Sequence, residues 1–127
     1  MKINSAVKEA SLILKKSFIK TPQLDSEILL GQVINKDREY IILNQDTNIG
    51  EESYNYFKNL IKQRSKGKPI AYLTGKKDFW KDQFRISEHV LIPRPDTEII
   101  VEQVLKITKF KSNLRVLDIG IGSGCIL

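Results

Sequence analysis

Cysteine and histidine are almost absent from this sequence of 127 residues, which contains one of each. The lone Cys125 excludes an internal disulfide, and Cys125 with His89 cannot supply the ligands of a structural zinc site, so no metal site is predicted. No apolar run approaches the roughly 20 residues of a membrane-spanning helix. Charged residues also interrupt the apolar positions of the N-terminal segment, which excludes a signal-peptide core. We therefore expect a cytoplasmic protein.

The sequence is instead rich in positive charge, with a net charge of +6 that is unevenly distributed. Eight basic residues against one acid, Asp78, lie in a single stretch: Lys58, Lys62, Arg64, Lys66, Lys68, Lys76, Lys77 and Lys81. Such a stretch is either a solvated face or a docking surface for an acidic partner. Because no aromatic residues alternate with these charges, we do not expect nucleic-acid binding, except indirectly through the ribosome.

The first half of the chain has the periodicity of helices. Four helices are predicted, within residues 4–17, 21–35, 37–44 and 51–67. Thr21 followed by Pro22 is a helix start, Asp37 is a candidate cap, and Gly67 is placed to end the fourth helix. Four helices joined by short links predict a small helical bundle.

The pattern changes after Pro69. We expect a brief helical turn ending at Gly75, then a β-hairpin that turns around Lys81 and Asp82. A further helix, capped by Asp96 or Thr97, carries apolar residues around much of its girth and is predicted to be well buried. The apolar run at residues 115–119 reads as a central parallel strand.

A glycine-rich segment follows that predicted strand and comprises Asp118, Gly120, Ile121, Gly122, Ser123 and Gly124. Glycine allows a sharp turn and a close approach of the backbone to a ligand. The spacing is neither the dinucleotide fingerprint nor a P-loop, because no third glycine has the dinucleotide spacing and no lysine follows. It resembles motif I of the class I methyltransferases that use S-adenosylmethionine. A plain glycine turn between strand and helix is the alternative.

Three segments in order, "KPIAYLTGKKDFW", "FRISEHVLIPRPDTEIIVE" and "DIGIGSG", resemble the bacterial release factor glutamine methyltransferases. The resemblance implies a mainly α fold: a helical substrate-recognition domain over residues 1–74, a hairpin and linker over 75–95, and over 96–127 the first strand of a Rossmann-like methyltransferase domain. It implies S-adenosylmethionine as cofactor and peptide chain release factors as protein substrates. A sister enzyme that methylates a ribosomal protein has a different linker, so Arg-Pro-Asp-Thr-Glu at residues 94–98 favours the release-factor type.

The resemblance also defines what this chain lacks. In the family, an Asn-Pro-Pro-Tyr motif beyond motif I holds the glutamine amide, and it is absent here. We therefore expect no catalytic residue in this chain, and we expect the chain alone to be inactive. It would be a truncated product, one piece of a split protein or an experimental fragment. Arg94, Thr97 and Glu98 are candidate active-site linker residues, although a purely structural role at a helix start explains them equally well.

Two other functions fit the same residues. The chain could be a non-enzymatic remnant that binds a release factor or the ribosome. It could also be a fragment of a nucleic-acid amino-methyltransferase, because the Asn-Pro-Pro-Tyr type of motif also serves that chemistry. In each case we expect a monomer without membrane contact.

Overall fold

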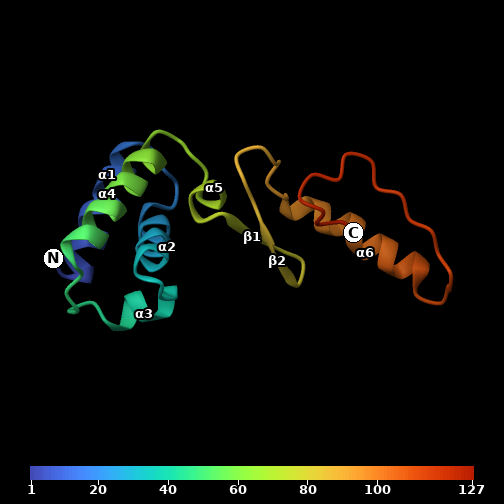
Figure 1. The fold of residues 1–127 in the computed structure, drawn as a ribbon, viewed down its shortest axis with the longest axis horizontal. Helices are drawn as coiled ribbons and strands as arrows, with labels where there is room; N and C mark the ends of the chain where they lie inside the picture. Colours follow the sequence, from blue (N-terminus) through green and yellow to red (C-terminus); the bar gives the residue numbers. More distant parts are fainter. The chain divides into compact units, whose positions relative to one another are not determined.

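The computed structural model describes all residues, 1–127, and divides the chain into two compact units, Met1–Thr74 and Gly75–Leu127 (Figure 1). The first contains α1 (Ile3–Lys16), α2 (Pro22–Ile34), α3 (Arg38–Leu43), α4 (Glu51–Ser65) and α5 (Ile70–Thr74). The second contains β1 (Lys76–Phe79), β2 (Asp82–Arg85), the 3-10 turn η1 (Pro95–Thr97) and α6 (Glu98–Thr108). The expected mainly α fold with a β-hairpin is therefore confirmed.

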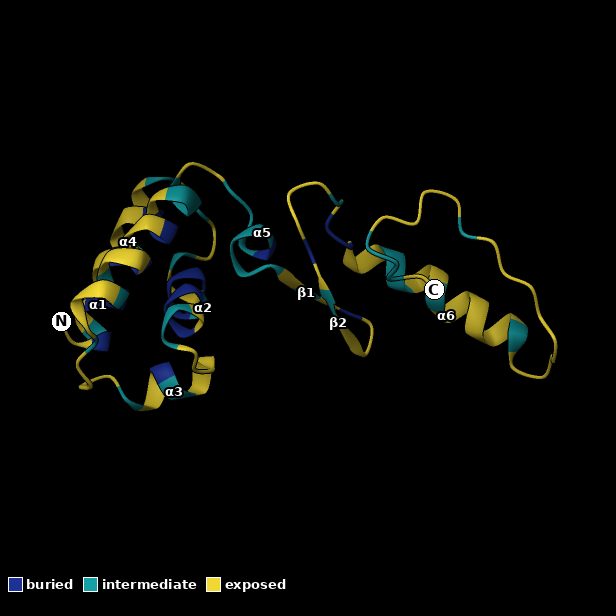
Figure 2. Cartoon of the chain, viewed as in Figure 1, coloured by how far each residue is buried: buried dark blue, intermediate teal, exposed yellow.

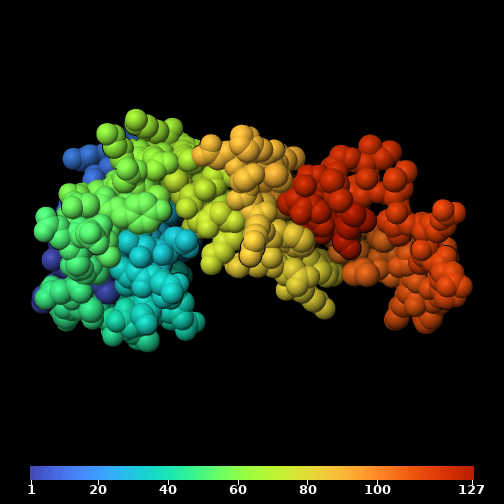
Figure 3. Space-filling view, viewed as in Figure 1, coloured from blue at the N-terminus to red at the C-terminus, as the bar shows by residue number.

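The hydrophobic core of the first unit lies between α1, α2 and α4. Each helix buries residues three or four positions apart, and α3 contributes one side chain. The core consists of Ile3, Ala6, Val7, Ala10, Leu14, Leu29, Leu30, Ile41, Phe57, Leu60 and Ile61. Buried positions lie on the inner sides of these helices (Figure 2), and in the space-filling view the atoms of the first unit close the gaps that the ribbons leave (Figure 3).

The helix ends follow local signals in the sequence. Asp37 caps α3 by accepting a hydrogen bond of 2.8 Å from the backbone N–H of Tyr40. Pro22 is the first residue of α2. Just beyond α4, Gly67 adopts a φ of +97° that L side chains rarely tolerate, and its N–H donates to the carbonyl of Arg64 at 2.9 Å. The predicted roles of Asp37, Pro22 and Gly67 are confirmed, whereas Thr21 does not cap α2 with its side chain, because its hydroxyl donates to Asp25.

The N-terminus is paired with the segment that precedes α4. The N–H of Ile3 donates to the carbonyl of Thr47 at 3.0 Å, and the N–H of Ile49 donates to the carbonyl of Met1 at 2.9 Å. Helices α1 and α4 therefore begin at the same end of the bundle and run side by side in the same direction (Figure 1).

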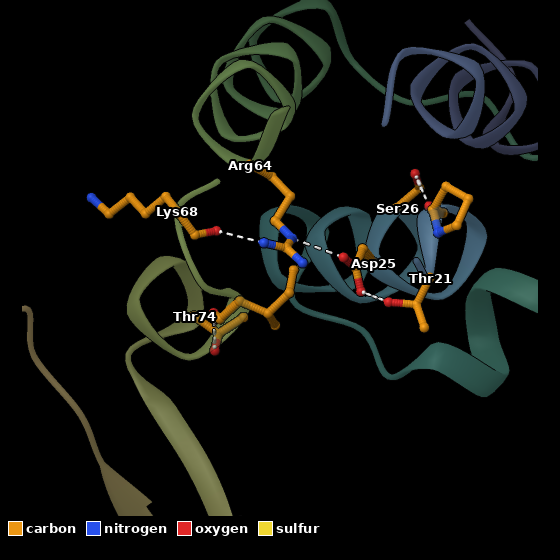
Figure 4. A network of polar contacts seen from close by, with 8 residues as sticks. Thr21, Asp25, Ser26, Arg64, Lys68 and Thr74 are labelled. Atoms are coloured by element: carbon orange, nitrogen blue, oxygen red, sulfur yellow. Dashed lines mark hydrogen bonds and ion pairs between the residues drawn. The ribbon is translucent and has the colours of Figure 1, made fainter. Parts of the chain in front are cut away.

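A largely buried ion pair joins two helices of the first unit. Asp25 on α2 is only 4% exposed and receives a hydrogen bond of 2.8 Å from Nε of Arg64 on α4. Nη1 of Arg64 also donates to the carbonyl of Lys68 at 3.1 Å, and the hydroxyl of Thr21 donates to the other Asp25 oxygen at 2.9 Å (Figure 4). The guanidinium thus joins α2, α4 and the link that leads to α5.

Replacing Arg64 tests this network. Arg64→Met keeps most of the side-chain volume but leaves the Asp25 carboxylate buried without a cation. The free energy of unfolding should fall by about 3–5 kcal/mol, the usual cost of breaking a buried pair from one side. Urea denaturation followed by far-UV circular dichroism measures it. Lys62→Met on the exposed side of α4 is the control and should change stability by less than about 0.5 kcal/mol. If Arg64→Met and Lys62→Met lowered the free energy of unfolding equally, a structural role for the ion pair of Asp25 and Arg64 would be contradicted.

Gly31, in the last turn of α2, is enclosed by the chain that leaves the helix. A Cβ added there would lie 2.7 Å from the carbonyl oxygen of Lys36, a backbone atom that cannot easily move. The turn is closed by the N–H of Lys36, which donates to the Gly31 carbonyl at 2.9 Å, and by Asn35, which adopts the left-handed conformation with a φ of +54°. The absent side chain therefore permits the tight passage from α2 to α3.

Gly31→Ala should be destabilising even though alanine is the better helix former. Displacing the Lys36 backbone should cost about 1–3 kcal/mol, more than the roughly 1 kcal/mol that alanine gains in helix propensity. Thermal unfolding should show a lower midpoint for Gly31→Ala than for Gln32→Ala, the exposed neighbouring position. A midpoint equal to or above that of the control would show that the turn relaxes freely.

The hairpin of the second unit is antiparallel and pairs Lys76 with Arg85 and Phe79 with Asp82. Its two-residue loop is Trp80 and Lys81, so the expected turn at residues 81–82 is wrong by one position. Trp80 occupies the left-handed region of backbone conformation, with a φ of +56°. Phe79 is 2% exposed, as expected for a residue that packs under the hairpin, whereas Trp80 is 40% exposed.

Three further expectations for the second unit are wrong. Helix α6 has no buried residue, and five of its six large aliphatic side chains are between 39% and 64% exposed (Figure 2). Its start lacks the expected side-chain cap, because Thr97 already has helical backbone angles at the end of η1. Residues 115–119 lie outside both strands, since a strand is defined by a hydrogen-bonded partner and none runs beside them.

Candidate functional site

The candidate ligand loop of the second unit extends from Asp118 to Gly124. Its three glycines, Gly120, Gly122 and Gly124, have φ angles of +75°, +56° and +79°. A Cβ at Gly120 or Gly124 would meet no atom within 4 Å, so the fold itself does not require glycine for space there. The N–H of Gly124 donates to the carbonyl of Ile121 at 2.9 Å, which closes one turn. These backbone angles suit a loop whose main chain approaches a ligand closely.

Asp118 is the one side chain of this loop with a buried polar atom that lacks a hydrogen-bond partner. Its Oδ2 atom is inaccessible to solvent and has no hydrogen-bond partner. A buried carboxylate oxygen without a donor is costly. The position therefore suits a ligand group or backbone amide that donates a hydrogen bond. Ile121 is exposed and Ser123 half-buried beside it.

The three linker candidates lie at the start of α6. Arg94 is exposed, and its carbonyl accepts a hydrogen bond of 3.1 Å from the N–H of Thr97 within η1. The carboxylate of Glu98 accepts a hydrogen bond of 2.8 Å from the N–H of Trp80 at the hairpin turn. No hydrogen bond or ion pair joins any of the three to Asp118. The bond to Trp80 was not predicted, because a side chain that accepts from a residue 18 positions away leaves no sequence pattern.

Other reactive side chains do not gather into a site. The chain has no group of three or more His, Cys, Asp and Glu residues that could hold a metal ion. His89 is exposed, and Cys125 is half-buried. None of the helices combines the length and the apolar character that crossing a bilayer requires.

The basic residues between Lys58 and Lys81 differ in their exposure to solvent. Lys58, Lys62 and Lys66 are exposed on or just beyond α4. Arg64 belongs to the buried pair with Asp25, and its side chain is only 18% exposed. A docking surface on this stretch therefore consists of the lysines. A charge reversal that included Arg64 would damage the bundle as well as the surface.

The contact between Glu98 and Trp80 can be followed directly, because the chain contains a single tryptophan. Glu98→Ala removes the acceptor that fixes the turn, so acrylamide should quench Trp80 fluorescence more efficiently. Glu98→Gln retains an acceptor oxygen and should behave like the parent. Glu102→Ala, one turn later and 3.6 Å from Lys106, is the control. If Glu98→Ala and Glu102→Ala gave the same quenching, the contact would not hold the turn.

The fold and loop define a class of protein in which a helical domain precedes a glycine-rich loop. The family model described as "PrmC N-terminal domain" matches residues 5–75. The chain belongs to this family. Over 99% of its length it is 46% identical to the release factor glutamine methyltransferase of Buchnera aphidicola subsp. Schizaphis graminum. It is 42% identical, over 98% of its length, to that of Leptospira interrogans. The predicted resemblance is therefore confirmed.

These relatives are longer proteins. The chain spans 45% of the Buchnera relative and 44% of the Leptospira relative. A protein named bifunctional methyltransferase from Rickettsia conorii is 36% identical, and the chain spans 28% of it. The similarity extends through the glycine loop as well as the helical unit.

Proposed function

We propose that this chain supplies the substrate-recognition unit and the cofactor loop of a methyltransferase that uses S-adenosylmethionine and methylates the glutamine of the Gly-Gly-Gln segment of release factors. One observation carries the proposal: identity of 46% over 99% of the chain, the glycine loop included, to a protein with that name. The site of action would be the cytoplasm, and the acting species a monomer.

Asp118 and the backbone of Gly120, Gly122 and Gly124 would hold the cofactor, with Ile121 and Ser123 alongside. Asp118 would accept a hydrogen bond from the ammonium group of the cofactor's methionine part, and this bond would satisfy its buried oxygen. When bound, S-adenosylmethionine supplies an electrophilic methyl group on a sulfonium. The loop contributes by fixing the direction in which that methyl group points.

The glutamine amide is a weak nucleophile, because its nitrogen lone pair is delocalised into the carbonyl. Transfer therefore needs acceptors that hold the amide hydrogens in line with the methyl group. We assign no such acceptor to this chain. Arg94 and Thr97 would border the site, while Glu98 would position the hairpin through Trp80. Residues 1–74 would hold the release factor, residues 75–95 would connect, and residues 96–127 would begin the catalytic domain.

The test compares the chain with a chimaera in which it is fused to the part of the Buchnera relative that it does not match. With a release factor and S-adenosylmethionine labelled in the methyl group, residues 1–127 alone should give no labelled glutamine, whereas the chimaera should. Asp118→Asn in the chimaera should weaken cofactor binding at least tenfold by calorimetry, because the neutral amide cannot pair with an ammonium group. Glu39→Gln, an exposed change on α3, should bind like the parent.

A folded chimaera that binds S-adenosylmethionine but never labels the Gly-Gly-Gln glutamine would refute the proposed substrate. A chimaera that labels glutamine equally well with Asp118→Asn would refute the role of that carboxylate. Transfer to nucleic acid instead would favour the amino-methyltransferase alternative.

A further inference from the structure

A groove of about 260 Å³ lies between the parallel helices α1 and α4. Its floor is apolar and consists of Ala6 and Ala10 from α1 and Phe57 and Ile61 from α4, all of which belong to the core. The two alanines are one turn apart, so α1 presents no large side chain there, and the groove remains open. Ile13 borders the same groove and is 40% exposed, which leaves an aliphatic side chain in contact with water at its edge.

The rim of the groove on α4 is positively charged. Lys58 and Lys62 line it, are exposed and lie one turn apart. Residues at this spacing on a helix are neighbours on one face, about 5–6 Å apart at Cβ. Neither makes an ion pair: Nζ of Lys58 lies 4.7 Å from the centre of the Tyr54 ring. No ion pair within the unit therefore engages either lysine.

The one carboxylate at the groove, Glu9, is already engaged. It accepts a hydrogen bond of 2.7 Å from the hydroxyl of Tyr54, and this bridge from α1 to α4 forms part of the groove's lining. The hydrogen bond, partial burial and the negative charge of Glu9 together raise the pKa of Tyr54 above its ordinary value of 10.0. The carboxylate of Glu9 keeps its negative charge but forms no ion pair with Lys58 or Lys62, so the two lysines outnumber the single carboxylate at the groove.

We propose that this groove binds one helix of another protein, an amphipathic helix whose apolar side chains lie on Ile13 and the floor and whose acidic side chains face Lys58 and Lys62. Two parallel helices leave a channel that suits a third helix packed along them. The cations select an acidic partner and exclude a basic one. The inference concerns the first unit alone and holds whether or not the chain takes part in methyl transfer.

The probe is a fluorescein-labelled, alanine-based peptide of about 16 residues, long enough to form a helix. Leucines at i, i+3 and i+4 form its stripe, and glutamates flank that stripe. Two companion peptides separate the contributions: one replaces the glutamates by glutamine, and the other replaces the leucines by serine. Fluorescence anisotropy with residues 1–127 should show saturable binding of the first peptide and at least about tenfold weaker binding of both companions.

Matched variants locate the site. Lys58→Glu with Lys62→Glu should weaken binding at least tenfold. Lys8→Glu with Lys20→Glu changes the net charge equally at exposed positions that do not line the groove, and should weaken it no more than about twofold. Ile13→Ala should weaken binding without changing charge. Circular dichroism establishes that each variant keeps its helices.

Four results would overturn the proposal. They are the absence of saturable binding, equal weakening by the two double variants, undiminished binding of the serine peptide, and displacement of the peptide by self-association of the chain. Undiminished binding of the serine peptide would indicate a general attraction for polyanions. Displacement of the peptide by self-association would indicate a second copy of this chain as the occupant. None of them bears on methyl transfer, so failure here is separate from failure of the proposed function.

Discussion

The buried carboxylate of Asp25 constrains how α2, α4 and the link to α5 pack in the first unit. An anion in a helical core must be matched by a cation and by further hydrogen bonds, and Arg64 and Thr21 provide both. Since Asp25 is on α2 and Arg64 is on α4, this requirement fixes one helix against the other. The second bond of Arg64, to the carbonyl of Lys68, extends the constraint to the start of α5. Apolar packing permits many small shifts of one helix against another, whereas the directional hydrogen bonds of the Arg64 guanidinium permit very few.

Local chemistry is what the sequence predicts well. The helices of the first unit follow from apolar periodicity, and Asp37, Pro22 and Gly67 act at their ends as their residue types require. The pair of Asp25 and Arg64 spans 39 positions and resembles any other acid and base until the helices are packed. The hairpin loop was misplaced by one residue because Trp80, a bulky residue, occupies a left-handed angle that normally favours glycine or asparagine.

The second unit shows a different limit of prediction. Apolar composition predicted a buried α6 and a central strand at residues 115–119, but burial depends on what covers a surface. In residues 75–127, α6 has no buried residue and the apolar run has no neighbouring strand. The loop from Asp118 to Gly124 nevertheless adopts three left-handed glycine angles, so its conformation is compatible with the motif that the sequence suggested. The candidate ligand residues stay a prediction from the sequence, whereas the bond of Glu98 to Trp80 leaves no pattern from which it could be predicted.

The pairing of Met1 and Ile3 with residues 47–49 has a consequence for biosynthesis. Met1 and Ile3 find these hydrogen-bond partners only after Thr47 and Ile49 have been made. The charge of Asp25 is likewise matched only when Arg64 emerges. Helix α1 and helix α2 must therefore wait, with their apolar faces incompletely covered, until α4 follows. The bundle should close in one late step during translation, and nascent chains that stall before α4 would be the ones most exposed to chaperones and proteases.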